Sequence, residues 1–356
     1  MVGGFLGAGK TTLLKETARR LAGQGKRISL ITNDQAGGLV DTSFLKIDND
    51  SVLEVSGSCF CCNFNGLLEA VGQARQKGQA EIIIAEPVGS CTDLSATILQ
   101  PLKDKYGDEY ELAPLTVLID PQKLQSLLAG DNAGLHGSSA YILKKQLEEA
   151  DVIAINKKDL LKTGKLADLM SETTENYPQA SVFSMIALDG DNVGSWLSYV
   201  LSANASGQNI AEVDYDIYAE GEAVLGWLNA TMTVSGPETN WNLFGKTLLR
   251  SLGENFDCEK VPVGHAKLML RAGDEYLIGN LTGKLDTLKI RGNIESTGQI
   301  ELILNIRFEM SPEQLKVLVR EEVDKALGKS LKGSQMILKC LSPGRPNPTF
   351  RYQKVV

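Results

Sequence analysis

Glycines, a lysine and two threonines near the amino terminus have the spacing of a phosphate-binding loop. Residues 4–11 fit the pattern GxxxxGK[ST], whose glycines let several backbone N–H groups point at one anion. The helix that follows adds its positive end. We expect Lys10 to reach the β- and γ-phosphates and the Thr11 hydroxyl to hold Mg²⁺. The residues expected to contact the nucleotide in this loop are Gly7, Ala8, Gly9, Lys10, Thr11 and Thr12.

A second nucleotide signal follows the apolar run 152–155, where the sequence reads Asn156-Lys157-Lys158-Asp159. An aspartate carboxylate can accept hydrogen bonds from both N1–H and the N2 amino group of guanine, whereas adenine offers no such donor pair. Buried hydrogen-bond pairs of this kind discriminate strongly between ligands. We therefore expect Asn156, Lys157 and Asp159 to bind the base, and GTP to be preferred over ATP.

Two further apolar runs lead to carboxylates. The run 28–32 leads to Asp34, and the run 81–85 leads to Glu86. Ligands of open α/β sheets bind at the carboxyl ends of strands, so Asp34 fits a Mg²⁺-associated role about as well as a turn or a helix cap. Glu86 can order the Mg²⁺ shell or the attacking water, and Gly89 can donate its N–H to the γ-phosphate. The expected catalytic residues are Lys10, Glu86 and Gly89.

Three cysteines lie within four residues of one another, at Cys59, Cys61 and Cys62. Such thiols can converge on one soft cation, for which Zn²⁺, Co²⁺ and Cu(I) all remain open, or they can be buried or redox-active. The chain has only two histidines, so a metal site must depend on sulfur and carboxylate. Cys91 follows Gly89 by two residues. A small buried residue is the favoured interpretation of Cys91, and a fourth thiol for the cluster is the alternative.

Composition narrows the class of protein. The net charge of −8 argues against nucleic acid or an anionic membrane as the main partner. We find no apolar run near the ~20 residues of a spanning helix and no signal-peptide pattern. Six cysteines with one tight cluster indicate intracellular metal or redox chemistry rather than a disulfide framework. These observations predict a cytoplasmic protein.

The pattern of apolar runs predicts an α/β fold in two domains. We expect a P-loop NTPase domain with a mostly parallel sheet at 1–201, a linker at 202–215, a smaller α+β domain at 216–342, ferredoxin-like in its element order, and an irregular tail at 343–356. Only three residues precede Gly4, so we expect either a start farther upstream or a short first strand. The expected helices of the first domain are 11–22, 65–76, 121–128, 141–150 and 192–201, with His136 in a loop.

This ordered set of motifs resembles the CobW-like P-loop GTPases, relatives of the nickel-insertion GTPases of urease and hydrogenase maturation. The resemblance covers about the first 200 residues. It implies a GTPase domain with a smaller carboxyl-terminal domain, phosphate and Mg²⁺ binding by Lys10, Thr11 and Thr12, and γ-phosphate sensing by Glu86 and Gly89. It also implies guanine binding by Asn156, Lys157 and Asp159, and metal binding by Cys59, Cys61 and Cys62.

Two departures from the family pattern are visible. Many members read Asn-Glu-Phe-Gly-Glu after the second strand, whereas this chain reads Asn33-Asp34-Gln35-Ala36-Gly37 and lacks the second acid. Many members also carry a His-rich stretch for metal storage, which this sequence does not contain.

Our first hypothesis is a GTP-hydrolysing metallochaperone that holds Zn²⁺ or Co²⁺ and delivers it to a client metalloprotein. Hydrolysis should be slow without a partner, because no arginine finger is evident in the sequence. The alternative is a GTPase partner protein that gates a corrinoid (cobalamin) enzyme, with structural or redox-active thiols. A nucleotide kinase is disfavoured by Asn156-Lys157-Lys158-Asp159. Dimerisation on GTP binding stays open.

Overall fold

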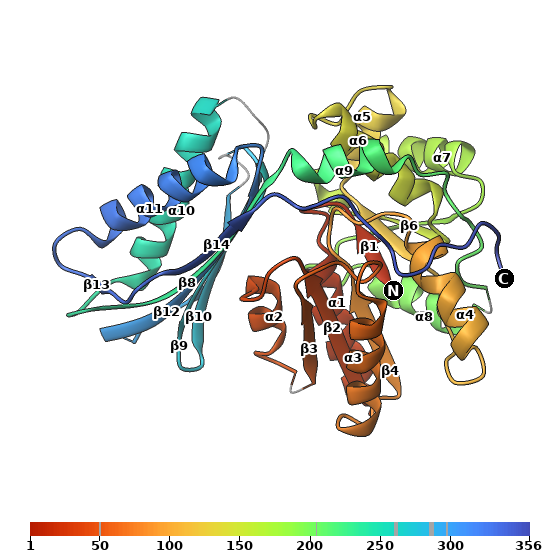
Figure 1. Ribbon diagram of the computed structural model, residues 1–356, viewed down its shortest axis with the longest axis horizontal. Coiled ribbons are helices and arrows are strands. Elements are labelled where there is room, and N and C mark those ends of the chain that lie inside the picture. Colours follow the sequence, from red (N-terminus) through yellow and green to blue (C-terminus); the bar gives the residue numbers. More distant parts are fainter. Residues whose placement is uncertain (50, 204, 260–262, 285–287, 297) are drawn as a thin grey trace. The chain divides into compact units, whose positions relative to one another are not determined.

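The computed structural model describes residues 1–49, 51–203, 205–259, 263–284, 288–296 and 298–356, and it divides into two compact units (Figure 1). Unit 1 comprises Met1–Gln35, Asp48–Gly221 and Arg345–Val356, and unit 2 comprises Ala36–Ile47 and Glu222–Gly344. Each unit therefore contains a short segment that is distant in sequence from the rest of it. This division departs from the contiguous domains expected above at residues 36–47, 202–221 and 345–356.

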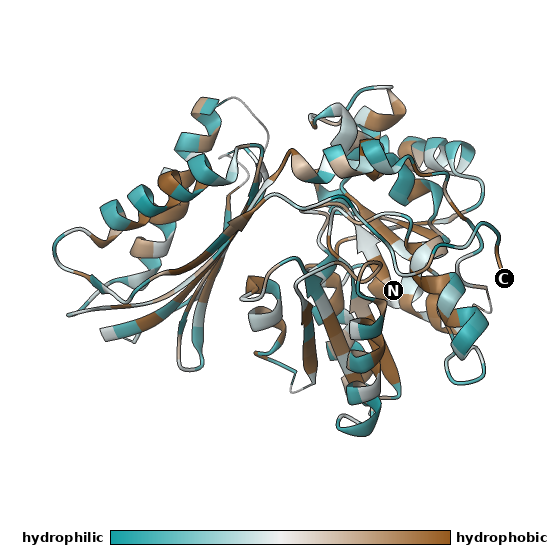
Figure 2. Cartoon of the chain, viewed as in Figure 1, coloured by the Kyte–Doolittle hydropathy of each residue, from teal (hydrophilic) through white to brown (hydrophobic). Residues whose placement is uncertain are grey.

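Parallel strands form the centre of unit 1. One sheet has the order β1-β5-β6-β7 and the other β3-β2-β4, and β1 lies in contact with β4. Strands β5 and β6 are rich in apolar residues and buried along their whole length, as expected for parallel strands covered on both faces (Figure 2). β1 is three residues long and pairs with β5 at Val2↔Thr116. The strands are β1 Val2–Gly4, β2 Ile28–Asp34, β3 Val52–Ser56, β4 Ile82–Glu86, β5 Thr116–Ile119, β6 Val152–Asn156 and β7 Ser181–Met185.

Helices connect these strands, and several begin at a capping side chain. Asn63 accepts from the N–H of Gly66 at the start of α3, and Asp120 accepts from the N–H of Gln122 at the start of α5. The helices are α1 Lys10–Gly23, α3 Phe64–Gln76, the π-helix η1 Ser95–Leu99, α4 Gln100–Tyr106, α5 Pro121–Leu128, α6 Gly137–Glu148, the 3₁₀ turn η2 Lys158–Leu160, α7 Lys165–Asn176, α8 Val193–Ser202 and α9 Tyr215–Ala223.

The structure corrects two boundaries. Helix α6 begins four residues earlier than expected, because the His136 imidazole accepts from the N–H of Ser138 and caps it; His136 is thus a capping residue. Helix α9 covers residues 215–223, where no helix was expected, and its first residue lies in the stretch 202–215 that was expected to be a linker. The Asp214 carboxylate accepts from the N–H groups of Asp216 and Ile217 there, a capping signal that the sequence analysis overlooked.

An antiparallel sheet forms unit 2. Its order is β11-β10-β9-β12-β8-β13, and β14 also pairs with β8. The set β14-β8-β12-β9 has the ferredoxin-like order with α10 and α11 as its two helices, and the extra hairpin β10–β11 extends one edge. The elements are α2 Val40–Leu45, β8 Gly226–Gly236, α10 Trp241–Glu259, β9 Val263–Ala272, β10 Glu275–Gly283, β11 Lys289–Asn293, β12 Gly298–Phe308, α11 Pro312–Leu327, β13 Lys332–Gly333 and β14 Ile337–Leu341.

Both faces of this sheet are covered. Alternate residues of β12, including Leu302 and Leu304, belong to the core beneath α10 and α11. Ile303 points to the other face, where it packs with Val40 and Phe44 of α2. The expected fold class, a P-loop NTPase domain with a smaller α+β domain, is confirmed. Among the described residues, no helix is long and apolar enough to cross a membrane.

Candidate functional site

The loop between β1 and α1 curls around the Lys10 ammonium group. Nζ of Lys10 donates to the carbonyls of Gly4 at 2.8 Å and Phe5 at 3.5 Å. Gly9 has φ 101°, and a Cβ there would lie 2.3 Å from Nδ2 of Asn156. A positive φ together with such a close neighbour favours glycine at this position. The loop therefore has the backbone path that a phosphate-binding loop needs.

Glu86 joins this loop from the carboxyl end of β4. Its Oε1 accepts from the Thr11 hydroxyl at 3.1 Å and lies 4.0 Å from Nζ of Lys10. Lys10, Thr11 and Glu86 are each less than a tenth exposed, so the charges of Lys10 and Glu86 interact with little screening by water. Asp34 is also buried, at the end of the neighbouring strand β2, where its carbonyl accepts from the N–H of Gly57. The structure thus gathers Lys10, Thr11 and Glu86 at one sheet edge.

Gly89 lies against the phosphate-binding loop. A Cβ at Gly89 would lie 2.8 Å from Cδ2 of Leu6 and 3.1 Å from Nζ of Lys10. The carboxamide of Gln146 donates to the carbonyls of Gly89 at 3.1 Å and Cys91 at 2.7 Å. Gln146, a buried residue of α6, was absent from our sequence-based candidates, since nothing in its sequence context indicates this contact.

Asn156 and Lys157 connect the loop after β6 to the phosphate-binding loop. Asn156 donates to the carbonyl of Ala8 at 2.8 Å and accepts from the N–H of Ala187 at 2.9 Å. Nζ of Lys157 donates to the carbonyl of Gly7 at 2.8 Å and to Asp120 at 3.3 Å. Asp159 lies in the 3₁₀ turn η2 and is exposed. Asn156 and Lys157, two of the three residues expected to bind the base, therefore hold the backbone of the phosphate-binding loop.

Lys123 adds a positive charge that the sequence analysis missed. Its ammonium donates to the carbonyl of Leu6 at 3.3 Å and lies 5.3 Å from the ring centre of Phe5. Burial lowers the pKa of Lys123 to about 8, against the opposing effect of Asp120. Lys123 lies on a short helix and matches no sequence motif, so its contact with this loop is visible only in the folded structure.

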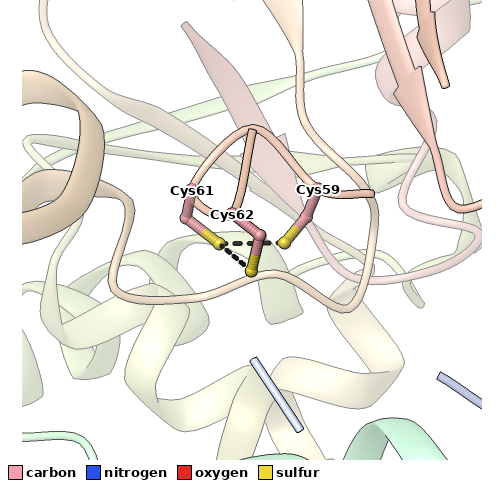
Figure 3. Close-up of side chains that lie close together, drawn as sticks. All are labelled: Cys59, Cys61 and Cys62. Atoms are coloured by element: carbon pink, nitrogen blue, oxygen red, sulfur yellow. Dashed lines mark hydrogen bonds between the residues drawn. The ribbon is translucent and has the colours of Figure 1, made fainter. Parts of the chain in front are cut away.

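The three clustered cysteines lie between β3 and α3 with their sulfur atoms turned toward one another (Figure 3). Sγ of Cys61 lies 2.9 Å from that of Cys59 and 3.8 Å from that of Cys62. Among the described residues, this is the one group of three or more His, Cys, Asp or Glu side chains whose potential metal ligands all lie within 4.8 Å of each other. Zn–S bonds of about 2.3 Å place two thiolates of a tetrahedron about 3.8 Å apart. If the sulfur atoms of Cys59 and Cys61 moved slightly apart, their distance would match that of a zinc site.

Burial and mutual hydrogen bonds distribute the protons of the cluster unequally. Hydrogen bonds from Cys61 and Cys62 hold the pKa of Cys59 well below the usual thiol range. Its hydrogen bond with Cys59 raises the pKa of Cys61, and the same partner raises the pKa of Cys62 to about 11. Cys59 is therefore the thiol of the three that ionises most readily. A bound divalent cation would displace the protons that remain on the cysteines.

Cys91 belongs to the same neighbourhood. Its side chain is 1% exposed, and its thiol contributes to the lowered pKa of Cys59 and the raised pKa of Cys61. Cys91 stands two residues after Gly89, so the segment that lies on the phosphate-binding loop also supplies a thiol close to the cluster.

Asn33 holds the cysteine loop to strand β2. Its Nδ2 donates to the carbonyls of Val55 at 2.9 Å and Ser58 at 2.8 Å, and its Oδ1 accepts from the N–H of Phe60 at 2.8 Å. This buried carboxamide thus makes two hydrogen bonds to the cysteine loop and one to strand β3. The sequence places Asn33 at a strand end but gives no sign of this positioning role.

Two curated proteins that are similar to this chain both have names that refer to zinc. Over 172 residues the chain is 26% identical to zinc-regulated GTPase metalloprotein activator 1 of Schizosaccharomyces pombe, covering 46% of this chain and 39% of that protein. It is 25% identical over 194 residues to a zinc chaperone CobW of a Sinorhizobium species, covering 49% and 54%. The chain thus spans about half or less of the length of these curated relatives.

Two solved structures are similar to this chain at lower identity. HypB from Helicobacter pylori in complex with nickel is 17% identical, with a TM-score of 0.42 over 56% of this chain and 83% of that one. The Zn(II)-bound YjiA GTPase from E. coli is 15% identical, with a TM-score of 0.37 over 90% and 96%. The model of the CobW/HypB/UreG nucleotide-binding domain matches residues 1–184, more than half of the 356 residues. The chain therefore belongs to the CobW/HypB/UreG family, as its motifs indicated.

Proposed function

We propose that this protein is a GTP-hydrolysing metallochaperone that carries Zn²⁺, or Co²⁺, on Cys59, Cys61 and Cys62 to a client metalloprotein. The observation that carries the proposal is the convergence of three sulfur atoms within one compact unit that also holds the phosphate-binding loop. The names of the curated relatives, a zinc-regulated GTPase activator and zinc chaperones, support it. Free thiols of this kind favour the reducing cytoplasm as its location.

The residues around the phosphate-binding loop have distinct roles in this proposal. Lys10 neutralises the β- and γ-phosphates, and Thr11 with Asp34 holds Mg²⁺. Glu86 accepts from Thr11 and is placed to orient the Mg²⁺ shell or the attacking water. Gly89 offers its N–H to the γ-phosphate. Asn156 and Lys157 brace the loops, which leaves guanine recognition to the exposed carboxylate of Asp159.

The thiols and the nucleotide loop are joined by two short connections. One is Asn33, which precedes Asp34 and binds the cysteine loop. The other is the stretch from Gly89 to Cys91, whose ends contact the phosphate-binding loop and the cluster. A nucleotide that shifts either connection changes metal affinity, and linkage requires the metal to change nucleotide affinity by the same factor.

A competition titration tests this function. Zn²⁺ is titrated against a chromophoric chelator with Mg²⁺ and either a GTP analogue or GDP, for the wild-type chain and for a variant with all three clustered cysteines changed to serine. We expect tight binding that differs between nucleotides and is lost in the variant. Weak binding that ignores both nucleotide and cysteines would overturn the metallochaperone and favour the alternative, a GTPase that gates a corrinoid protein. Sedimentation of the same samples would reveal a nucleotide-dependent homodimer.

A further inference from the structure

The carboxyl-terminal residues of the chain lie on unit 1, although the sequence predicts only an irregular tail there. Figure 1 shows this dark-blue segment ending beside α4, where the N–H of Val356 donates to Gln100 at 2.9 Å. The N–H of Tyr352 donates to the carbonyl of Ala96 at 3.0 Å, and its hydroxyl donates to Asp104. Residues 345–356, hereafter the strap, are thus held by specific contacts along their length.

The strap contacts the cysteine loop directly. The backbone N–H of Asn347 donates to Sγ of Cys62 at 3.2 Å. The N–H of Thr349 donates to the carbonyl of Cys61 at 2.8 Å, and its hydroxyl lies 3.4 Å from the carbonyl of Cys62. The strap therefore bonds to the backbone of two of the cysteines and to the sulfur atom of one of them.

The strap lies where an ion would leave the cluster. Cys59 and Cys61 are each 2% exposed, and Cys62 alone among the three is partly accessible. Cys62 is also the thiol to which Asn347 donates. Prolines at 346 and 348 flank Asn347, and their fixed φ angles lower the entropy lost when this part of the strap is ordered.

An ion pair anchors the strap beyond the thiols. Nε of Arg351 donates to Oδ2 of Asp93 at 2.6 Å, and the hydroxyl of Tyr215 donates to the same carboxylate at 2.8 Å. Asp93 is fully buried and has φ 65°, an uncommon backbone conformation for a residue other than glycine. Between Arg351 and the thiols, the ring of Phe350 packs edge-on against Phe64 with centroids 5.3 Å apart.

Asp93 is four residues from Gly89, which lies against Lys10. The segment 89–93 therefore contacts the phosphate-binding loop at one end and the strap at the other. We propose that the strap retains the metal ion on the thiols, and that the nucleotide acts on its Arg351–Asp93 anchor through this segment to set the rate of release. The inference rests on the proposed metal-carrying function and adds the element that regulates the same site.

Stopped-flow transfer of Zn²⁺ from the loaded, full-length protein to excess chromophoric chelator tests the strap. Arg351→Ala removes the anchor, and Asn347→Pro removes the N–H that faces Cys62. We expect each variant to release Zn²⁺ about tenfold faster than wild type. Arg345→Ala is the matched control, because it removes a cation of the strap whose ion pair with Asp216 is largely exposed. Its release rate should stay within about twofold of wild type.

Two comparisons separate failure of the strap from failure of the metal site. A wild-type chain that takes up no Zn²⁺ overturns the proposed function itself. A wild-type chain that binds Zn²⁺ through its cysteines, with unchanged release in both Asn347→Pro and Arg351→Ala, overturns the strap alone. The nucleotide link is tested by measuring release with Mg²⁺-GTP analogue and Mg²⁺-GDP. We expect the release rate of wild type to differ between the two nucleotides, and this difference to disappear in Arg351→Ala. If the difference persists in that variant, the proposed role of the anchor is wrong.

Discussion

At the scale of single residues, the phosphate-binding loop depends on a buried cation. Lys10 is 7% exposed, and its ammonium lies among the carbonyls of Gly4 and Phe5 and the carboxylate of Glu86. A cation in such a position is stabilised by its immediate neighbours rather than by water. When the loop holds phosphates, the same charge is available to them without being brought in from solvent.

Lys10→Ala should abolish GTP hydrolysis, since the charge that builds up on the phosphates would lose its nearest cation. Release of inorganic phosphate from Mg²⁺-GTP measures this. Lys15→Ala serves as the control on the same helix, because Lys15 pairs with Asp48, which is more than half exposed. Turnover that survives in Lys10→Ala would refute the assignment of the phosphate-binding loop.

Glu149 makes a contribution to stability that depends on pH. It is fully buried, accepts from the N–H of Ser95 at 2.8 Å and from the Thr92 hydroxyl at 3.0 Å, and burial raises its pKa to about 8, with Asp93 adding to the rise. The folded pKa exceeds the unfolded value of 4.5, so this contribution is complete below pH 4.5 and is lost as pH rises through 8.

Replacing Glu149 with glutamine, which mimics the protonated acid, should remove that dependence. Between pH 5 and 8 the stability of wild type relative to Glu149→Gln should fall by at most about 1.4 kcal/mol per pH unit. Thermal unfolding of both proteins at several pH values measures the difference. A difference in midpoint that stays constant over this range would show that Glu149 ionises in the folded chain much as it does in the unfolded one.

At the scale of elements, local signals predicted what lies close in sequence. The apolar runs at 81–85 and 152–155 correspond to β4 and β6, and the phosphate-binding loop, Glu86 and Gly89 come together because parallel strands end at one edge. Strap contacts such as Arg351 with Asp93 join residues 258 positions apart, and no short-range pattern encodes them. Strand β11 escaped prediction for another reason, because its sequence (Lys-Ile-Arg-Gly-Asn) forms a largely exposed edge strand with few apolar residues.

Asn33 illustrates how one element positions another, since it fixes the cysteine loop to β2 through two hydrogen bonds and makes a third to β3. Asn33→Ala leaves these backbone groups without their partner, and the loop should lose its fixed shape. We expect Zn²⁺ affinity to fall about 10- to 100-fold, the range found for residues that support metal ligands. Chelator competition measures it, with the exposed Asn176→Ala of α7 as the control. Unchanged affinity would mean that the loop keeps its shape without Asn33.

Cys91 brings the segment after β4 to the same loop, and its thiol influences the pKa of Cys59 and Cys61, although it lies outside the group of three sulfur atoms within 4.8 Å of one another. We expect a bound ion to draw Cys91 in as a fourth thiolate. Loading the protein with Co²⁺ makes the number of thiolates visible in the sulfur-to-cobalt charge-transfer absorption. In Cys91→Ser we expect this absorption to fall by about one quarter, while tight binding persists on three thiolates. An identical spectrum in the variant would exclude Cys91 from the coordination shell.

At the scale of the whole molecule, segments taken from distant parts of the sequence complete both units. The strap completes unit 1, and residues 36–47, which directly follow β2, complete unit 2. Within unit 2, Asn305 accepts from the N–H of Val40 at 2.7 Å, and Asn229 donates to the carbonyl of Ala36 at 2.9 Å. Asp34 and Gln35 are therefore the covalent link between a strand end at the candidate nucleotide site and a segment that belongs to the antiparallel sheet.

Lys267 offers a test of how the segment 36–47 is held within unit 2. Its ammonium donates to both carboxylate oxygens of Asp41, at 2.8 and 2.6 Å, and both side chains are mostly buried. In Lys267→Ala the amides of residues 36–47 should exchange hydrogen about tenfold faster, because the Asp41 charge loses its partner. Hydrogen exchange by mass spectrometry measures this, with exposed Lys316→Ala as the control. In wild type, exchange of this segment should also differ between Mg²⁺-GTP analogue and Mg²⁺-GDP; an equal rate in both would show that nucleotide does not reach unit 2 by this path.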